Sequence, residues 1–130
     1  QINLQPKNKT ALLDVGIAKQ FSKKLLDFMA DERPYLNPDL SLKLLADMVE
    51  IHPNQLSWLL NEQIGKNFNE FINQYRVEHF KALATSPDHT HISLIGLAYE
   101  SGFNSKTVFN TFFKKQIGCT PSEFVKSNRK

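Results

Sequence analysis

The sequence predicts an all-α protein of about seven helices, in which two helix-turn-helix units are joined by a long connecting helix. Apolar side chains recur at the three- and four-residue spacing of amphipathic helices along most of the 130-residue chain. No segment shows a convincing alternation of β-branched and polar residues, which a strand requires. Glycine, proline and short polar residues separate the helical segments.

The chain is expected to begin with a linker, followed by one helix and a turn. Residues 1–15 are polar and are predicted to form the linker. Residues 16–40 are predicted to form the helix and the turn, because Phe21, Leu25 and Phe28 lie at helical spacing and two prolines bracket the turn. The first residue is Gln rather than Met, so we expect either a piece of a longer protein or a processed product.

The first helix-turn-helix unit is predicted at about residues 42–64. Ser41 can cap its first helix, which extends to about Val49. Pro53 suits the first position of its second helix because the ring fixes φ at a helical value. Gly65 is the expected end of that helix.

A connecting helix is predicted over about residues 67–85. Asn67, with Glu70 three residues later, forms a capping box at its start. At 1.5 Å per residue such a helix spans roughly 27 Å. The second helix-turn-helix unit follows at about 93–117, and a short last helix begins at Pro121.

The two units share a sequence pattern, which indicates an internal repeat. Gln-Ile-Gly at 63–65 recurs 53 residues later at 116–118. Ala46 and Ala98 match at an offset of 52 and supply the small residue that a close helix crossing requires.

The turn between the two helices of a unit favours a residue that accepts positive φ. Gly102 meets this requirement in the second unit. Glu50 stands at the matching place in the first unit and departs from the pattern.

Composition and charge exclude several classes of protein. The formal net charge of +3 is the sum of +3 over residues 1–30, −5 over residues 31–105 and +5 over residues 106–130. The single Cys119 excludes an internal disulfide, and it forms no metal-ligand spacing with the four histidines. No glycine-rich phosphate loop or catalytic constellation is present, so we expect no enzyme activity, no metal and no cofactor. No apolar run approaches the roughly 18 residues of a membrane span.

Residues over about 40–127 form one pattern, made up of Leu45-Ala46, Leu56-Ser57, Gly65, Phe68, Tyr75-Arg76-Val77, Gly102-Phe103-Asn104-Ser105-Lys106, Phe109, Phe113-Lys114-Lys115, Gly118, Thr120-Pro121 and Phe124. This pattern resembles the C-terminal DNA-binding domain of AraC/XylS transcription regulators. The resemblance implies a bacterial DNA-binding domain, and it assigns residues 41–130 to that domain. Phe80 and Ala84 depart from the family pattern, which usually has Ala and Leu there, and Gly96 replaces a common capping Glu.

In a helix-turn-helix unit the second helix enters the major groove of DNA. In the second unit, Lys106 can donate to guanine, Asn110 can pair with adenine and Thr107 can touch a thymine methyl group. The lysines near the end of the helix and the Ser105 hydroxyl suit phosphates. The candidate residues of this unit are Ser105, Lys106, Thr107, Asn110, Thr111, Lys114 and Lys115.

We call the second helix of each unit, its recognition helix, the reading helix. The reading helix of the first unit carries side-chain amides and no lysine or arginine. Trp58 is predicted either to pack on thymine methyls and sugars or to be a partly covered core residue. Arg76, on the connecting helix, is placed either to contact a phosphate or to form a structural ion pair, and the ion pair is favoured because the resemblance puts this residue at the junction of the two units. The candidate DNA-contacting residues of this unit are Asn54, Gln55, Ser57, Trp58 and Asn61.

We therefore expect a sequence-specific reader of double-stranded DNA, the output domain of a transcription regulator. Two reading helices about one DNA turn, roughly 34 Å, apart would read two successive major-groove segments. RNA polymerase, and an upstream sensor or dimerisation region of the same chain, are the other expected partners. The expected location of this domain is the cytoplasm. The resemblance extends to regulators whose full-length chain is anchored in a membrane. The alternative is a helical protein-protein interaction module without direct DNA readout.

Overall fold

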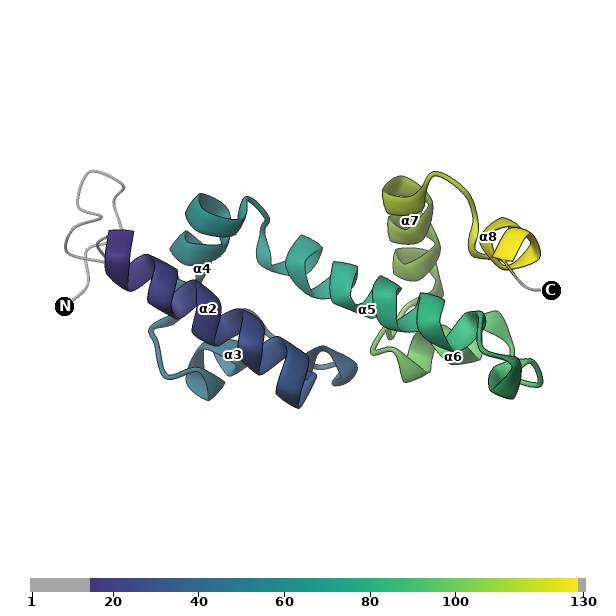
Figure 1. Ribbon diagram of the computed structural model, residues 1–130, viewed down its shortest axis with the longest axis horizontal. Coiled ribbons are helices and arrows are strands. Elements are labelled where there is room, and N and C mark those ends of the chain that lie inside the picture. Colours follow the sequence, from purple (N-terminus) through teal and green to yellow (C-terminus); the bar gives the residue numbers. More distant parts are fainter. Residues whose placement is uncertain (1–14, 129–130) are drawn as a thin grey trace. The chain divides into compact units, whose positions relative to one another are not determined.

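The computed structural model describes residues 15–128 (Figure 1). Within those residues it holds seven α-helices and no strand, which confirms the predicted all-α fold. The predicted linker, residues 1–15, lies outside the described residues except for Val15. No helix in the described range is long and apolar enough to cross a membrane. The helices are α2 (Val15–Glu32), α3 (Leu42–Met48), α4 (Pro53–Leu59), α5 (Phe68–Ala84), α6 (Leu94–Glu100), α7 (Lys106–Ile117) and α8 (Pro121–Asn128).

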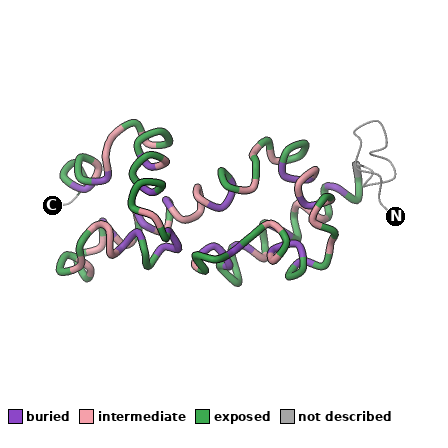
Figure 2. The backbone as a smooth tube through the Cα atoms, turned by 180° about the vertical axis from the view of Figure 1, so that it is seen from behind, coloured by how far each residue is buried: buried purple, intermediate pink, exposed green. Residues whose placement is uncertain are grey.

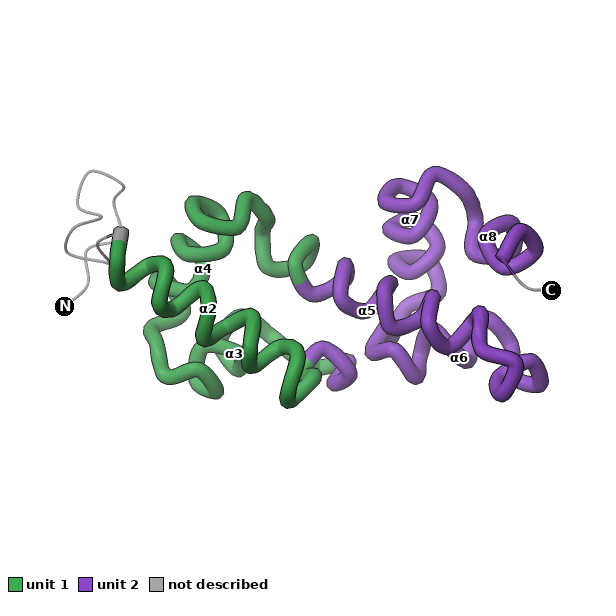
Figure 3. Tube along the Cα trace, in the orientation of Figure 1, with its two compact units in different colours: residues 1–34, 39–71 green, residues 35–38, 72–130 purple. Residues whose placement is uncertain are grey.

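The chain divides into two compact units, which Figure 3 shows in different colours. Unit 1 contains α2, α3 and α4 and continues to Phe71. Unit 2 contains the remaining helices from Ile72 onward, together with the short segment Tyr35–Pro38. Each unit thus holds one helix-turn-helix pair, α3 with α4 in unit 1 and α6 with α7 in unit 2.

Most helix ends are fixed by local side-chain or backbone devices that the sequence predicts. The Ser41 hydroxyl oxygen accepts a hydrogen bond from the Leu44 backbone N–H at 3.1 Å, which caps α3. Asn67 and Glu70 form the predicted capping box at the start of α5, with hydrogen bonds of 2.8 and 3.0 Å. Pro53 begins α4 as predicted.

The second helix of unit 1 differs from its predicted form. The sequence predicts one helix from Pro53 to about Ile64, but the α-helix ends at Leu59 and a π-helical turn follows over Leu60–Ile64. In this turn the Leu60 carbonyl accepts hydrogen bonds from the N–H groups of both Gly65 and Lys66, at 2.7 and 3.1 Å. Such wide turns are rare and cannot be read from the apolar spacing alone.

The core of unit 1 lies between α2, α3 and α4. Apolar residues from one face of each helix are buried, and Figure 2 shows these buried stretches alternating with exposed ones along the chain. Helix α2 contributes to this core through three side chains, and the helix-turn-helix pair supplies most of the rest. The buried apolar residues of unit 1 are Ala18, Leu25, Met29, Leu40, Leu45, Ala46, Val49, Leu56, Leu59, Leu60 and Phe71.

Aromatic rings build the core of unit 2. The ring of Phe80 on α5 lies edge-on to those of Phe109 and Phe113 on α7, with centroids 4.8 and 5.5 Å away. Ala84, one turn after Phe80, is completely buried in the same cluster. The buried members of the cluster are Val77, Phe80, Ala84, Leu97, Ala98, Phe103, Phe109, Phe113 and Val125.

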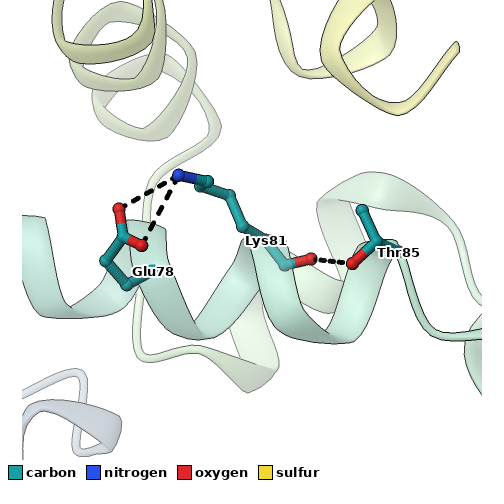
Figure 4. A network of polar contacts seen from close by, with 3 residues as sticks. All are labelled: Glu78, Lys81 and Thr85. Atoms are coloured by element: carbon teal, nitrogen blue, oxygen red, sulfur yellow. Dashed lines mark hydrogen bonds and ion pairs between the residues drawn. The ribbon is translucent and has the colours of Figure 1, made fainter. Parts of the chain in front are cut away.

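Helix α5 also carries a small polar network in unit 2 (Figure 4). The Lys81 ammonium lies 3.2 Å from a carboxylate oxygen of Glu78, and the Thr85 hydroxyl donates to the Lys81 carbonyl at 2.7 Å. The same ammonium lies 5.6 Å from the ring centroid of Phe124 on α8. Lys81 therefore links the connecting helix to the last helix.

Both helix-turn-helix turns contain a residue with positive φ. Gly102 has φ of 105° in unit 2, as the sequence predicts. Glu50 has φ of 62° at the matching place in unit 1, although its side chain disfavours this conformation. Both turns therefore have a residue with left-handed backbone conformation at the matching position.

Candidate nucleic-acid interface

Helix α7 presents one face to the core of unit 2 and the opposite face to solvent. Its start is fixed by Ser105, whose hydroxyl oxygen accepts a hydrogen bond from the Val108 backbone N–H at 3.2 Å. Phe109 and Phe113 are buried on the inner face, 1% and 0% exposed. Gly118, with φ of 91°, ends the helix.

The residues predicted to contact DNA on α7 lie on its solvent face. The structure leaves six of them exposed, whereas Ser105 is half-buried because its hydroxyl caps the helix. No acidic residue occurs among the twelve residues of α7. The face is therefore positively charged and rich in hydrogen-bond donors. The six exposed residues are Lys106, Thr107, Asn110, Thr111, Lys114 and Lys115.

The solvent face of α7 borders two open grooves within unit 2. One, of about 490 Å³, runs between the C-terminal half of α7 and the start of α8. The other, of about 540 Å³, lies between the starts of α6, α7 and α8. Asn110 lines both grooves, and the half-buried free thiol of Cys119 lies in the turn between α7 and α8. In residues 15–128 no group of three or more His, Cys, Asp or Glu side chains is placed to hold a metal ion.

The turn that precedes α7 is held by the segment Tyr35–Pro38. The Arg76 guanidinium on α5 donates hydrogen bonds to the carbonyls of Tyr35 and Asn37, at 2.8 and 2.9 Å. Gly102 lies so close to this segment that an added Cβ would be 2.1 Å from the Tyr35 carbonyl oxygen. Tyr35 also stacks on Tyr75, with ring centroids 5.3 Å apart.

Arg76 therefore has a different partner from the one expected. The sequence predicts a structural ion pair, but the guanidinium bonds to two backbone carbonyls and, at 3.0 Å, to the side-chain oxygen of Asn73. It also lies over the ring of Phe103, 5.9 Å from its centroid. Burial lowers the pKa of Arg76 from its usual value, and these carbonyl partners compensate for lost water. Every residue has a backbone carbonyl, so the sequence cannot indicate that Arg76 bonds to the carbonyls of this turn.

The reading helix of unit 1 begins with a cap in which histidine is the acceptor. His52 Nδ1 accepts from the Asn54 backbone N–H at 3.1 Å, and the Gln55 side-chain oxygen accepts from the His52 N–H at 2.9 Å. The carboxamide of Gln55 is thus committed to the cap, while Asn54 is exposed. Sequence reasoning missed this role for His52, although its place before Pro53 is a signal for it.

The other predicted contacts of unit 1 are less accessible than those of α7. Ser57 is half-buried, and its carbonyl accepts a hydrogen bond from the exposed Asn61 amide at 2.8 Å. Trp58 is half-buried with its indole nitrogen turned into the protein. The indole N–H therefore points away from solvent, and only part of the ring faces outward.

The two reading helices differ in charge at matching positions. The 53-residue offset of the repeat pairs Lys114 with Asn61 and Lys115 with Glu62. Helix α4 and the π-helical turn after it carry no lysine or arginine. Electrostatic attraction for phosphates is consequently concentrated on α7.

Val108 is an exposed apolar residue of α7 that the predicted set omits. Its exposed fraction is 48%, although it precedes the buried Phe109. The signal for it is geometric, because a helical wheel anchored on Phe109 and Phe113 turns position 108 away from the core.

Comparisons with known proteins match this geometry. The family described as "Helix-turn-helix domain" matches residues 45–127. The uncharacterised transcriptional regulatory protein YesN of Bacillus subtilis (strain 168) is 36% identical over 103 residues, covering 78% of this chain and 27% of that protein. An uncharacterised HTH-type transcriptional regulator of Staphylococcus aureus (strain COL) is 32% identical over 90 residues, covering 69% of this chain and 12% of that protein. The chain thus spans about a quarter or less of the length of these relatives.

Two solved structures share the fold. A Listeria innocua protein of unknown function superposes with a TM-score of 0.70 at 26% identity, covering 83% of this chain and 97% of that one. The C-terminal domain of the two-component response regulator yesN from Fusobacterium nucleatum has a TM-score of 0.68 at 23% identity, covering 82% of this chain and 98% of that one. The family match covers more than half of the chain, and it spans both helix-turn-helix pairs apart from the first three residues of α3. The chain therefore belongs to the helix-turn-helix domain family and is a DNA-binding domain of the AraC/XylS type.

Proposed function

We propose that this domain is the output part of a longer transcription regulator and that it reads two successive major-groove segments of double-stranded DNA. The observation that carries the proposal is the solvent face of α7, where Lys106, Asn110 and Lys114 stand exposed on one basic helix. Arg and Lys donors suit guanine and phosphates, and an Asn side chain suits adenine. The Bacillus and Staphylococcus relatives, which are described as transcriptional regulators, support it.

The two units are proposed to contribute differently. Unit 2 supplies most of the attraction for phosphates, because α7 carries three lysines and no acidic residue. Unit 1 contributes mainly selectivity, because the exposed amides of Asn54 and Asn61 can bond to base edges but bring no charge. In this view Lys106 specifies a base, whereas Lys115 holds a phosphate.

The remaining partners are proposed from the same role. An upstream region of the longer chain senses the signal or dimerises, and the bound domain contacts RNA polymerase. The domain acts in the cytoplasm, where the DNA is accessible, and membrane anchoring belongs to the upstream part in those regulators that have it.

A salt titration with lysine variants tests the role of α7. A preferred site is first selected from random double-stranded DNA, and affinity is then measured across salt concentrations. Lys115→Ala should weaken all sequences alike and reduce the slope of log affinity against log salt by about 0.9. Lys106→Ala should relax the preference at one base pair, at a cost of about 1–3 kcal/mol for the preferred base.

Two further variants sharpen this test. Glu62→Lys places a cation at the position that matches Lys115, so it should steepen the salt slope by about 0.9. Lys19→Ala removes an exposed cation from α2, outside both proposed faces, and should leave base preference unchanged. If Lys106→Ala and Lys115→Ala bind every sequence like the parent, the assignment of this face to DNA is wrong.

The two-segment arrangement has its own test. A hydroxyl-radical footprint should show two protected regions about one helical turn, roughly 10 base pairs, apart. Inserting about five base pairs between them rotates one region by half a turn and should abolish the joint contact. Protection confined to one half-turn would contradict reading by both units. Affinity that does not change with salt would instead favour an apolar protein contact.

A further inference from the structure

Val108 stands out among the valines of unit 2. Its side chain is 48% exposed, whereas Val77 and Val125 are 1% and 7% exposed in the core. It is the third residue of α7, in the first turn of the helix, which is the part that reaches base edges in a helix-turn-helix unit.

Two threonines extend this apolar surface. Thr107 and Thr111 are both exposed, and residues three and four apart on a helix are surface neighbours. Val108 with Thr111, and Thr107 with Thr111, meet this spacing. The three side chains therefore carry their methyl groups on one continuous strip of α7, which we call the methyl strip.

The methyl strip has no evident structural purpose. β-Branched residues are poorer helix formers than alanine, lysine or glutamine, and at largely exposed positions they gain little packing in return. Such a local conflict with helix propensity is expected at functional positions. The strip is also absent from unit 1, where the 53-residue offset puts Asn54, Gln55 and Trp58 at the matching positions.

We propose that the methyl strip, with Val108 at its exposed edge, reads the C5-methyl groups of thymine in the DNA segment that faces α7. This inference rests on the proposed function of α7 as a reading helix. Thymine is the one base of the four that presents a methyl group in the major groove, and apolar side chains recognise it there. The lysines of α7 hold phosphates and a guanine, so the strip adds preference for A·T pairs at neighbouring positions.

The test removes single methyl groups from the DNA. In the selected site, each thymine facing α7 is replaced in turn by deoxyuridine, which lacks only the C5-methyl group. Burial of one methylene-sized group is worth about 0.8 kcal/mol, so each contacted methyl should account for about a four-fold loss in affinity. The parent protein should show this loss at one or two thymines.

Val108→Ala completes a double-mutant cycle with the DNA change. We expect the variant to bind the thymine site a few-fold more weakly and to bind thymine and deoxyuridine equally at the position that Val108 contacts. Val108→Thr keeps one methyl group and should retain part of the preference. Leu26→Ala, at a side chain 42% exposed on α2, is the matched control and should keep the parent's thymine preference.

Thermal melts distinguish this role from a structural one. Val108→Ala should melt at the same temperature as the parent or higher, since alanine is the better helix former. Lower stability would assign Val108 to packing and overturn the proposal. The proposal would also be overturned if the parent bound the thymine and deoxyuridine sites equally well. Equal weakening of both sites by Val108→Ala would overturn it too, and would fit contact of Val108 with a protein partner. Failure of the parent to select any DNA would instead contradict the proposed function itself.

Discussion

Gly102→Ala should destabilise unit 2 far more than a glycine substitution normally does. Gly102 has φ of 105°, and its Cα faces the segment Tyr35–Pro38. A Cβ would lie 2.1 Å from the Tyr35 carbonyl oxygen and 2.8 Å from Arg76 Nε, where ordinary contact begins at 3.4 Å. The segment must therefore retreat by about 1.3 Å, and a backbone oxygen has no rotamer with which to give way.

The cost of Gly102→Ala has two parts. A side chain in the left-handed region costs about 1 kcal/mol. Retreat of the segment breaks the two hydrogen bonds from Arg76 to the carbonyls of Tyr35 and Asn37, each worth about 1.5–3 kcal/mol because the donor is charged. We therefore expect the free energy of unfolding to fall by about 4–7 kcal/mol.

Gly118→Ala is the matched control for this substitution. Gly118 has φ of 91°, but a Cβ there would meet nothing within 4 Å. It shares the conformational cost without the collision, so it should lose only about 1 kcal/mol. Urea denaturation followed by far-ultraviolet circular dichroism measures both variants. Losses within about 1 kcal/mol of each other would refute the role given to the Tyr35–Pro38 segment.

Two further substitutions test local features of each unit. Glu50→Gly should raise the unfolding free energy by about 0.5–1 kcal/mol, because glycine relieves the left-handed conformation at a smaller entropic cost. Its exposed ion pair with Lys24, at 3.7 Å, adds little, and Glu50→Ala, which keeps the Cβ, should bring no such gain in urea melts. Glu123 accepts a hydrogen bond from the Thr120 backbone N–H, which lowers the pKa of Glu123 below its ordinary value. That contribution is present at neutral pH and is lost as the pH falls through the lowered pKa, so Glu123→Gln should flatten the acid limb of stability against pH.

The elements that sequence reasoning predicted well are those fixed within a few residues. Ser41 and the pair Asn67 and Glu70 bond to backbone groups three positions away, and the ring of Pro53 fixes its own φ at the start of α4, so the residue types and spacing suffice. The turn at Glu50 shows the limit of this approach. The departure from glycine is visible in the sequence, but the retention of positive φ at this position is not.

The features that the sequence left out depend on distant segments or on geometry. Arg76 bonds to carbonyls 41 and 39 residues earlier in the chain, and a backbone oxygen leaves no residue-type signature. The π-helical turn after Leu59 keeps the same apolar spacing as a regular helix. Among the candidate DNA contacts, exposure on α7 follows from the buried phenylalanines, whereas the commitment of Gln55 to a cap required knowing where α4 begins.

The division into two units also allows the distance between them to be followed by fluorescence energy transfer. The chain has one tryptophan and one cysteine. Trp58 belongs to unit 1, and the free Cys119 belongs to unit 2. Energy transfer from the indole to an acceptor attached at the thiol therefore reports the separation of the two units without any introduced residue. Equal transfer in the free and DNA-bound protein would indicate a fixed frame, and a change on binding would indicate that DNA sets the spacing of the two reading helices.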